Sequence, residues 1–511
     1  MKKLLGLVAI VCMLICLPCA AYAAIIDSGE CGDNVSWTLD DEGMLTISGE
    51  GDMWGYYDYG NQPWYEKFVK IVVIENGVTS IGFGDFYYCE NLTGISIPSS
   101  VTTIAGSAFS HCGNLNISVD SNNENFCDID GVLFSKDKKE ILAYARDKIQ
   151  PDYTIPNGVT TIGDYAFYGC NSLTNVSIPN SVTTIDAYAF YSCKSLTSIS
   201  ISSSVAAISR DAFSRCGNLN ISVDSNNEKF CDIDGVLFSK DKKEIQAYAK
   251  DKIQPDYTIP NSVISIGDAA FFSCESLTSV HIPNSVTSIG RQSFYCCAKL
   301  NILVDNDNEN FCDIDGVLFT KDKKEILKYA KDEIQPYYEI PDGVTSLDNL
   351  AFFGCFSLIS VSIPDSVTSI GGSEFGDCIS LTDVYYSGSE ADWNAIPIGT
   401  YNQWLTDAII HYNSNGIPTP KTPVVDIVSG TNGVYELKAT LSDIPYPCKL
   451  ITVLYNNSGA ITDCDIQNVT SFDTEKIVTV DGANTKTVKA FIWDSLNGMR
   501  PLCGAAEMQI N

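Results

Sequence analysis

A unit of 23 residues repeats along this chain and constrains its fold more than any other feature. The unit reads L-x-x-V-x-I-P-x-x-V-x-x-I-x-x-x-A-F-x-x-C, as in residues 173–193. Its last isoleucine position, the marker of each coil, recurs at intervals of 23 or 58 residues. The markers are Ile81, Ile104, Ile162, Ile185, Ile208, Ile266, Ile289, Leu347 and Ile370. A fixed period of this length indicates a solenoid, in which each coil buries its apolar edge against its neighbours.

Two further positions keep the same register and predict ladders inside the solenoid. A phenylalanine follows each marker by five residues and a cysteine by eight. The predicted aromatic ladder is Phe86, Phe109, Phe167, Phe190, Phe213, Phe271, Phe294, Phe352 and Phe375. The predicted cysteine ladder is Cys89, Cys112, Cys170, Cys193, Cys216, Cys274, Cys297, Cys355 and Cys378. Parallel Cβ vectors in such a stack oppose disulfides, so we expect these cysteines to be reduced packing residues.

Three insertions of 35 residues separate groups of units and are near copies of one another. They begin at Asn125, Lys229 and Asn310, and each contains D-G-V-L-F followed by the charged stretch KDKK. Apolar residues 132–134 and 141–144 flank this stretch in the first copy. The pattern predicts a β-hairpin with a polar turn, and a short helix over KKEILAYA is the alternative.

These residues resemble the BspA-type (Treponema-type) leucine-rich repeat family of bacterial surface proteins. The resemblance rests on the L-x-x-I-x-I-P and I-G-x-x-A-F-x-x-C parts of the unit and on the D-G-V-L-F hairpins, and it covers about residues 72–412. It implies a β-rich solenoid and, for some members, adhesion to host extracellular-matrix proteins or to other bacteria. The family's adhesive role is not tied to a residue motif, so the resemblance gives no ligand.

The first residues predict export. Lys2 and Lys3 precede an unbroken apolar stretch, residues 4–17, and Ala21-Tyr22-Ala23 is an A-x-A cleavage site. This arrangement is typical of a signal peptide, here residues 1–23. The apolar stretch is shorter than the roughly 20 residues that a membrane span needs. We therefore expect a secreted or cell-surface protein that has no membrane insertion after signal cleavage.

The repeats divide the rest of the chain into parts. We expect residues 24–71 to form an N-terminal β cap, residues 72–383 the leucine-rich-repeat solenoid, and residues 384–413 its C-terminal cap. Residues 414–423 are a proline-punctuated linker. Strand-like runs in residues 424–511 fit an immunoglobulin-like β-sandwich. The predicted fold is thus a β-rich leucine-rich-repeat solenoid of 23-residue coils with three β-hairpin insertions, followed by a small all-β sandwich domain.

Residues that could carry chemistry occupy interchangeable repeat positions. His111 precedes a ladder cysteine, His281 takes a strand position that is serine in other coils, and His411 lies in the predicted cap. Motifs for a serine nucleophile, for phosphate binding or for a zinc protease are missing, and no C-x-x-C pair follows the signal peptide. We therefore predict no catalytic, cofactor-binding or metal site and no enzymatic activity. A hydrolase would need a singular polar cluster in residues 424–511.

The charge balance narrows the possible partners. A formal net charge of −31 argues against nucleic acid, whose phosphates need lysine and arginine, and against attachment to anionic lipid. We expect an exported repeat protein that binds or adheres to proteins of host or microbial surfaces. The alternative is a glycan- or cell-wall-binding scaffold that uses the C-terminal β-sandwich.

Two surfaces compete for the predicted partner. The outward strand positions are small and polar, without the Trp, Tyr and Arg that anchor interfaces, and they include Gly94, Asn175, Ser198, Ser279 and Ser360. The hairpins carry tyrosines beside clustered lysines, so we expect partners at the hairpin edge or the C-terminal domain. The candidate contact residues are Tyr144, Tyr153, Tyr248, Tyr257, Tyr329 and Tyr337. The alternative, equally open, is that these tyrosines shield the join between hairpin and solenoid.

Overall fold

The structure is a computed structural model. It describes residues 23–417 except 57–59, 113, 145–150, 210, 217–218, 249–254, 298, 330–335 and 349. Beyond these it describes the segments 424–431, 434–441, 448–456, 458, 461–469, 475–481, 487–493 and 506–509. The predicted signal peptide therefore lies outside the described residues, apart from its last position.

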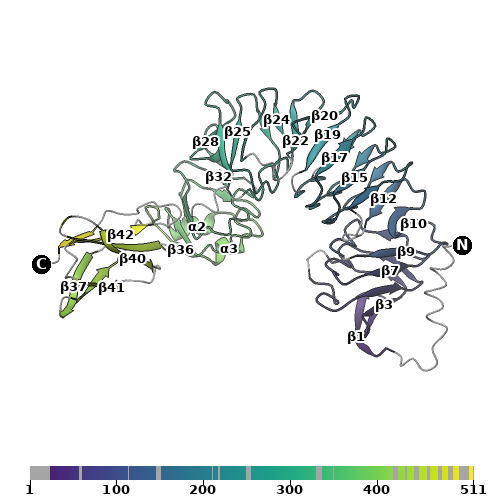
Figure 1. The fold of residues 1–511 in the computed structure, drawn as a ribbon, viewed down its shortest axis with the longest axis horizontal. Coiled ribbons are helices and arrows are strands. Elements are labelled where there is room, and N and C mark those ends of the chain that lie inside the picture. Colours follow the sequence, from purple (N-terminus) through teal and green to yellow (C-terminus); the bar gives the residue numbers. More distant parts are fainter. Residues whose placement is uncertain are drawn as a thin grey trace. The chain divides into compact units, whose positions relative to one another are not determined.

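Each coil contributes a short strand to one of four separate sheets, and the outward sides of these sheets are here called the strand face of each unit (Figure 1). These strands come from the L-x-x-V-x-I part of the repeat, where every second side chain points inward. They are β5 (Ile71–Ile74), β7 (Gly94–Ile97), β9 (Asn116–Val119), β13 (Asp152–Thr154), β15 (Asn175–Ser177), β17 (Ser198–Ile201), β19 (Asn220–Val223), β23 (Asp256–Thr258), β25 (Ser279–Ile282), β27 (Asn301–Val304), β31 (Tyr337–Glu339), β33 (Ser360–Ile363), β35 (Asp383–Tyr386) and β36 (Ile409–His411).

A second row of very short strands carries the markers. These strands are β4 (Gly51–Asp52), β6 (Val78–Ile81), β8 (Thr103–Ile104), β14 (Thr161–Ile162), β16 (Thr184–Ile185), β18 (Ala207–Ile208), β24 (Ser265–Ile266), β26 (Ser288–Ile289), β32 (Ser346–Leu347) and β34 (Ser369–Ile370). Equivalent residues pair in parallel, as Ile162 does with Ile185. The predicted solenoid is confirmed.

Threonine side chains tie successive coils together. The Oγ1 hydroxyl of Thr174 donates to the carbonyl of Pro151 at 3.1 Å, and that of Thr278 donates to Pro255 at 3.1 Å. On the marker side, Thr183 donates in the same way to Thr160 at 3.2 Å. Each bond joins residues 23 positions apart, so one full turn of the solenoid is 23 residues.

Each insertion forms a three-stranded antiparallel meander. The copies are β10 (Phe126–Ile129), β11 (Val132–Ser135) and β12 (Glu140–Ala143); β20 (Phe230–Ile233), β21 (Val236–Ser239) and β22 (Glu244–Ala247); and β28 (Phe311–Ile314), β29 (Val317–Thr320) and β30 (Glu325–Lys328). The predicted hairpin across the charged turn is confirmed, and the alternative helix is wrong. The sequence analysis missed the first strand of each copy.

The insertions are part of the solenoid rather than appendages. Strand β12 pairs in parallel with β14, so Ile141 faces Ile162 as one marker faces the next. Asp128 closes the preceding sheet, because its carboxylate accepts the backbone N–H of Val119 at 3.0 Å. The Cys127 thiol donates to the carbonyl of Ser135 at 3.4 Å. The other two copies repeat these bonds, which gives the recurrent aspartates and cysteines a structural role.

The N-terminal segment covers the first coil with an antiparallel sheet of β1 (Ile25–Gly32), β2 (Val35–Asp40) and β3 (Met44–Gly49). Strands β2 and β3 form a hairpin, and β3 pairs in parallel with β5 of the first coil. Trp64 is buried and lies on Phe86 with ring centroids 5.7 Å apart and an interplanar angle of 21°. The ring of Trp64 thereby extends the aromatic ladder by one position.

The last coils end differently. Strand β35 pairs in parallel with β33 and β36. Between β35 and β36 lie two short helices, α2 (Glu390–Ala395) and α3 (Gln403–Asp407). Ser389 caps α2 through a reciprocal capping box with Asp392. Trp393 and Leu405, one from each helix, complete the buried cluster around Phe375.

The C-terminal residues form two antiparallel sheets. One contains β37 (Val424–Thr431), β38 (Val434–Thr440) and β41 (Glu475–Asp481); the other contains β39 (Cys448–Tyr455), β40 (Ile461–Val469), β42 (Thr487–Trp493) and β43 (Ala506–Gln509). The three predicted strand runs lie in β38, β39 and β42. The assignment of residues 424–511 as an immunoglobulin-like β-sandwich stays a prediction.

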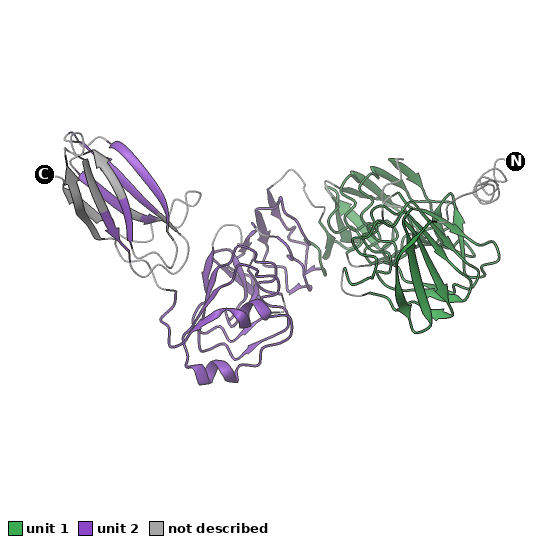
Figure 2. Cartoon of the chain, turned by 90° about the horizontal axis from the view of Figure 1, so that it is seen from below, with its two compact units in different colours: residues 1–252, 267–271 green, residues 253–266, 272–511 purple. Residues whose placement is uncertain are grey.

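The chain divides into two compact units, coloured separately in Figure 2. Unit 1 contains residues 1–252 and 267–271, and unit 2 contains residues 253–266 and 272–511. Each unit has its own stack of coils and its own buried cluster. The domain boundaries expected from the sequence remain predictions.

Candidate functional site

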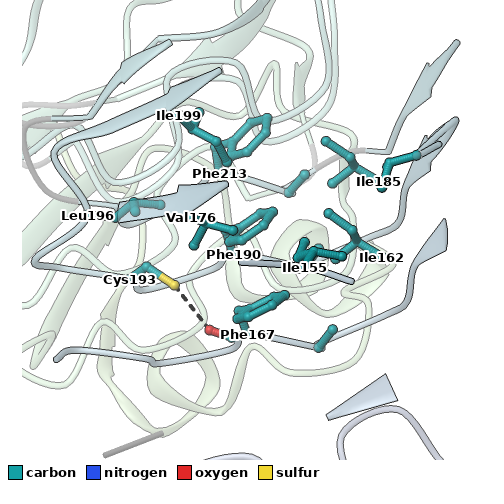
Figure 3. Close-up of a cluster of buried hydrophobic side chains, with 14 of the residues drawn as sticks. Ile155, Ile162, Phe167, Val176, Ile185, Phe190, Cys193, Leu196, Ile199 and Phe213 are labelled. Carbon is teal, nitrogen blue, oxygen red and sulfur yellow. Dashed lines mark hydrogen bonds between the residues drawn. The ribbon is translucent and has the colours of Figure 1, made fainter. Parts of the chain in front are cut away.

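The aromatic ladder residues lie inside the coils and are buried (Figure 3). Phe167 and Phe190 stack with centroids 5.0 Å apart and planes 11° apart. In unit 2, Phe352 and Phe375 stack at 4.9 Å and 7°. Parallel stacking at this spacing follows from the parallel register of the coils. These rings hold the fold together and are not exposed on the outer surface of the coils.

The cysteine ladder lies beside the rings, and its thiols act as hydrogen-bond donors. Cys193 Sγ lies 3.0 Å from the carbonyl oxygen of Phe167 (Figure 3). Cys378 Sγ lies 3.3 Å from the carbonyl oxygen of Phe352. Burial raises the pKa of the Cys89 thiol to about 12. A thiolate is the reactive form of cysteine, so the raised pKa of Cys89 suits packing and not nucleophilic chemistry.

Three of the candidate contact tyrosines are buried. Tyr144, Tyr248 and Tyr329 are 7%, 6% and 1% exposed. Each stacks on a ladder ring at 5.1 Å, for example Tyr144 on Phe167. Burial of these three side chains argues against partner contact and favours the shielding role, and partner contact stays a prediction. They occupy the phenylalanine position of the hairpin coils, and their 23-residue spacing from Phe167, Phe271 and Phe352 was the signal that the sequence analysis overlooked.

The other candidate tyrosines are half-buried at the join of hairpin and coil. Tyr153 in β13 contacts both Tyr144 and Phe167, with centroids 4.7 and 5.8 Å away. In the third copy the equivalent residue is Tyr338, which contacts Tyr329 at 4.7 Å. The predicted Tyr337 is one position off this pattern and packs toward Tyr385 and Ile417. Partner contact by Tyr153, Tyr257 and Tyr337 stays a prediction, and the packing favours the shielding role.

From β7 to β19 the strand face of unit 1 carries small and polar outward residues, whereas Ile71 of β5 is 38% exposed at its N-terminal end. Its outward residues include Asn175, Ser198 and Asn220 in one column, and these are exposed. In the adjacent column Ser200 and Ser222 lie side by side with their hydroxyl oxygens 3.1 Å apart. Short side chains that bond each other add little contact area for a partner.

The strand face of unit 2 carries larger side chains. His281 of β25 stands opposite Leu303 of β27, which is 40% exposed. The imidazole Nε2 of His281 lies 2.9 Å from Asp305 Oδ1. Near the last coil Ile409 is 63% exposed. The sequence predicted a small, polar face without interface anchors, and that prediction did not consider Leu303 or Ile409.

The last strands of unit 2 add an aromatic pair. His411 of β36 stacks on Tyr385 of β35 with centroids 4.5 Å apart and planes 10° apart. Its Nε2 atom lies 2.8 Å from Asp383 Oδ1. Burial raises the pKa of Tyr385 to about 12, so its hydroxyl stays protonated at neutral pH. The carboxylate and the ring fix the imidazole in one orientation before any partner arrives.

A family model describing a BspA type leucine rich repeat region matches the chain in six copies. The matched residues are 59–141, 142–249, 243–326 and 324–403, more than half of the sequence. The chain belongs to the BspA-type leucine-rich repeat family. No curated protein matches the chain.

Several solved structures are similar to this BspA-type protein. A leucine-rich cell surface protein from Faecalibacterium prausnitzii A2-165 is 29% identical, with a TM-score of 0.42, and the match covers 72% of this chain and 96% of that one. A leucine-rich repeat protein from Eubacterium ventriosum is 22% identical, with 77% and 96% covered and a TM-score of 0.34. The pneumococcal vaccine antigen PcpA is 17% identical, with 76% and 98% covered and a TM-score of 0.40.

The chemistry-bearing residues of this BspA-type chain stay apart. The third histidine, His111, stacks on Tyr88 at 4.4 Å in unit 1 and shares no element with the other two. Within the described ranges there is no group of three His, Cys, Asp or Glu residues that could hold a metal ion. The helices that the structure describes are all too short or too polar to cross a membrane.

Proposed function

We propose that this BspA-type protein is exported and binds partner proteins on host or microbial surfaces through the strand face of unit 2. The observation that carries the proposal is that two pairs of strands on that face, β25 with β27 and β35 with β36, carry larger side chains that are exposed or half-buried. His281, Leu303, Ile409 and His411 stand where unit 1 carries mostly hydroxyls and amides. Most of the binding free energy of an interface comes from a few larger side chains, whereas small polar residues contribute mainly shape complementarity.

The electrostatics of the face support the same proposal. Each imidazole is held by a carboxylate, His281 by Asp305 and His411 by Asp383. A side chain that is already fixed loses less entropy when a partner binds. The chain as a whole is acidic, with a net charge of −31, so a partner with a complementary basic surface would associate faster.

The proposal is tested with a double variant that gives β25 and β27 the residues of unit 1. His281→Ser with Leu303→Ser is matched to Ser200 and Ser222, which occupy the equivalent column. We expect affinity for the bound partner to fall at least about tenfold, the loss typical of removing an anchor. Binding is measured against immobilised extracellular-matrix proteins, intact bacteria, mucin and peptidoglycan.

The matched control is Ser200→Ala with Ser222→Ala on unit 1, which should keep affinity within about twofold. Unchanged binding by the unit 2 double variant would contradict the proposal. Retention on mucin or peptidoglycan that depends on residues 424–511 alone would instead favour a glycan- or cell-wall-binding scaffold.

A further inference from the structure

The third hairpin and the neighbouring coil of Phe294 line a partly open cavity of about 110 Å³ in unit 2. Its apolar wall contains Phe294, Phe311 and Leu318, which are all at most 9% exposed. The ammonium-bearing side chain of Lys328, from β30, lines the same cavity. A space of this size holds several water molecules or one small organic molecule.

Lys328 is an unusual residue for this place because it is only 8% exposed. Among the described residues, its Nζ donates to the carbonyl of Leu350 at 3.2 Å. An ammonium group has three donors, and a buried charge is costly unless other groups compensate it. A neutral carbonyl compensates only part of that cost, so an anion in the cavity would be stabilised.

The other two hairpins act as internal controls. The residue equivalent to Lys328 is Ala143 in the first copy and Ala247 in the second. The cavity residue Ser293 likewise replaces two alanines, Ala108 and Ala212. Both polar residues that replace alanines, Lys328 and Ser293, therefore line the same cavity. The fold does not require them, because the first two hairpins form the same meander without them.

The charges around the cavity favour an anion over a cation. Asp348 also lines the cavity, but it is exposed, and water screens an exposed charge strongly. Lys328 is buried, and its charge acts through a less polarisable medium than water. The positive charge of Lys328 therefore outweighs the negative charge of Asp348 inside the cavity. We propose that this cavity binds a small carboxylate, whose anionic group pairs with Lys328 and whose hydrocarbon part packs on Phe294, Phe311 and Leu318.

The test uses butyrate and benzoate as probes, with butyramide and benzamide as their neutral counterparts. Binding to the purified full chain is measured by calorimetry and by ligand-observed NMR. We expect at least one carboxylate to bind and its amide to bind at least about tenfold more weakly, because a charge-assisted hydrogen bond is lost.

The decisive variant is Lys328→Ala, which restores the residue of the other two hairpins and should fold. It should weaken carboxylate binding at least about tenfold. The control Lys324→Ala removes an exposed positive charge from the same hairpin and should leave binding unchanged. Equal binding by Lys328→Ala and the unaltered chain, equal binding of acid and amide, or no carboxylate binding at all would each overturn the proposal. None of these results depends on the strand face of unit 2.

Discussion

Interior and terminal coils solve the same packing problem with different residues. In interior coils, the position before the ladder phenylalanine is a small buried residue, such as Ala166 or Ala189. In the first and last coils of the series it is a carboxylic acid, Asp85 or Glu374, which is also buried. An interior coil has a neighbour on each side and needs only a small side chain there. A terminal coil meets irregular backbone instead.

The two buried acids hold that irregular backbone. Asp85 Oδ2 accepts the N–H of Gly82 at 2.6 Å, and the indole of Trp64 donates to the Asp85 carbonyl at 2.8 Å. At the other end Glu374 is hydrogen-bonded by the Asn402 side chain, which also accepts the N–H of Phe375 at 2.9 Å. The position before the ladder phenylalanine is therefore a buried, hydrogen-bonded acid at the two ends of the repeat series and a small buried residue in the interior coils.

The largest expected effect on stability comes from removing the contact between the N-terminal cap and the first coil. Trp64→Ala removes the ring that covers Phe86, and we expect a loss of about 3–5 kcal/mol in the free energy of unfolding, as for other buried aromatic truncations. Phe190→Ala in an interior coil is the matched comparison and should cost a similar amount. Urea denaturation followed by far-UV circular dichroism measures both. A cost below about 1 kcal/mol for Trp64→Ala would mean that the cap does not act as a ladder member.

The second prediction concerns the pH dependence of the same contact. Burial raises the pKa of Asp85 from 3.8 to about 7, so folding favours its protonated form. Its contribution is fully present below pH 3.8 and is lost as the pH rises to about 7. The loss amounts to about 4 kcal/mol, at 1.36 kcal/mol per pKa unit.

Asp85→Asn keeps an acceptor for Gly82 but cannot ionise. Relative to this variant, the unaltered protein should therefore lose stability steadily between about pH 4 and pH 7. Unfolding free energies of both proteins at each pH give the difference directly. A difference that stays constant across this range would show that Asp85 remains ionised in the folded state.

The smallest predicted effect tests a feature that interior and terminal coils share. Seven residues after each marker the backbone has positive φ, as at Gly354 (72°) and Asp377 (55°). A Cβ added at Gly354 would meet only Phe356, at 3.8 Å, so the site has room. Gly354→Ala should therefore cost about 1 kcal/mol through backbone strain alone.

Asp377→Ala is the control for this turn, because the residue is non-glycine before and after the change. It should alter the melting temperature by less than Gly354→Ala does. Equal shifts for the two variants in a thermal melt would remove backbone strain as the explanation.

The sequence predicted the coils because period and register are local properties. It predicted one hairpin per insertion but missed β10, although Asp130-Gly131 is the dipeptide that favours a tight two-residue turn. The structure shows positive φ at both residues, 51° and 78°. The burial of Tyr144 was not predicted, because Tyr144 was interpreted within its hairpin and not against the ring 23 residues later.

The cavity at Lys328 could not be predicted from the sequence for a different reason. Its walls come from β28, β29, β30, the coil of Phe294 and the turn that follows β32, and the distances between them depend on how these segments pack. The substitution of alanine by lysine was visible in the aligned insertions, but burial was not. The same holds for the His411 and Tyr385 pair, which pairing of β35 with β36 brings together.

The threonine bonds between coils have an evolutionary consequence. Because Thr174 and Thr278 each reach a carbonyl 23 positions back, deletion or duplication of one whole turn would offer the displaced hydroxyl an equivalent acceptor. Recombination can thus lengthen or shorten such chains by whole turns without interrupting the hydrogen bonds between coils. Insertions of any other length would interrupt them.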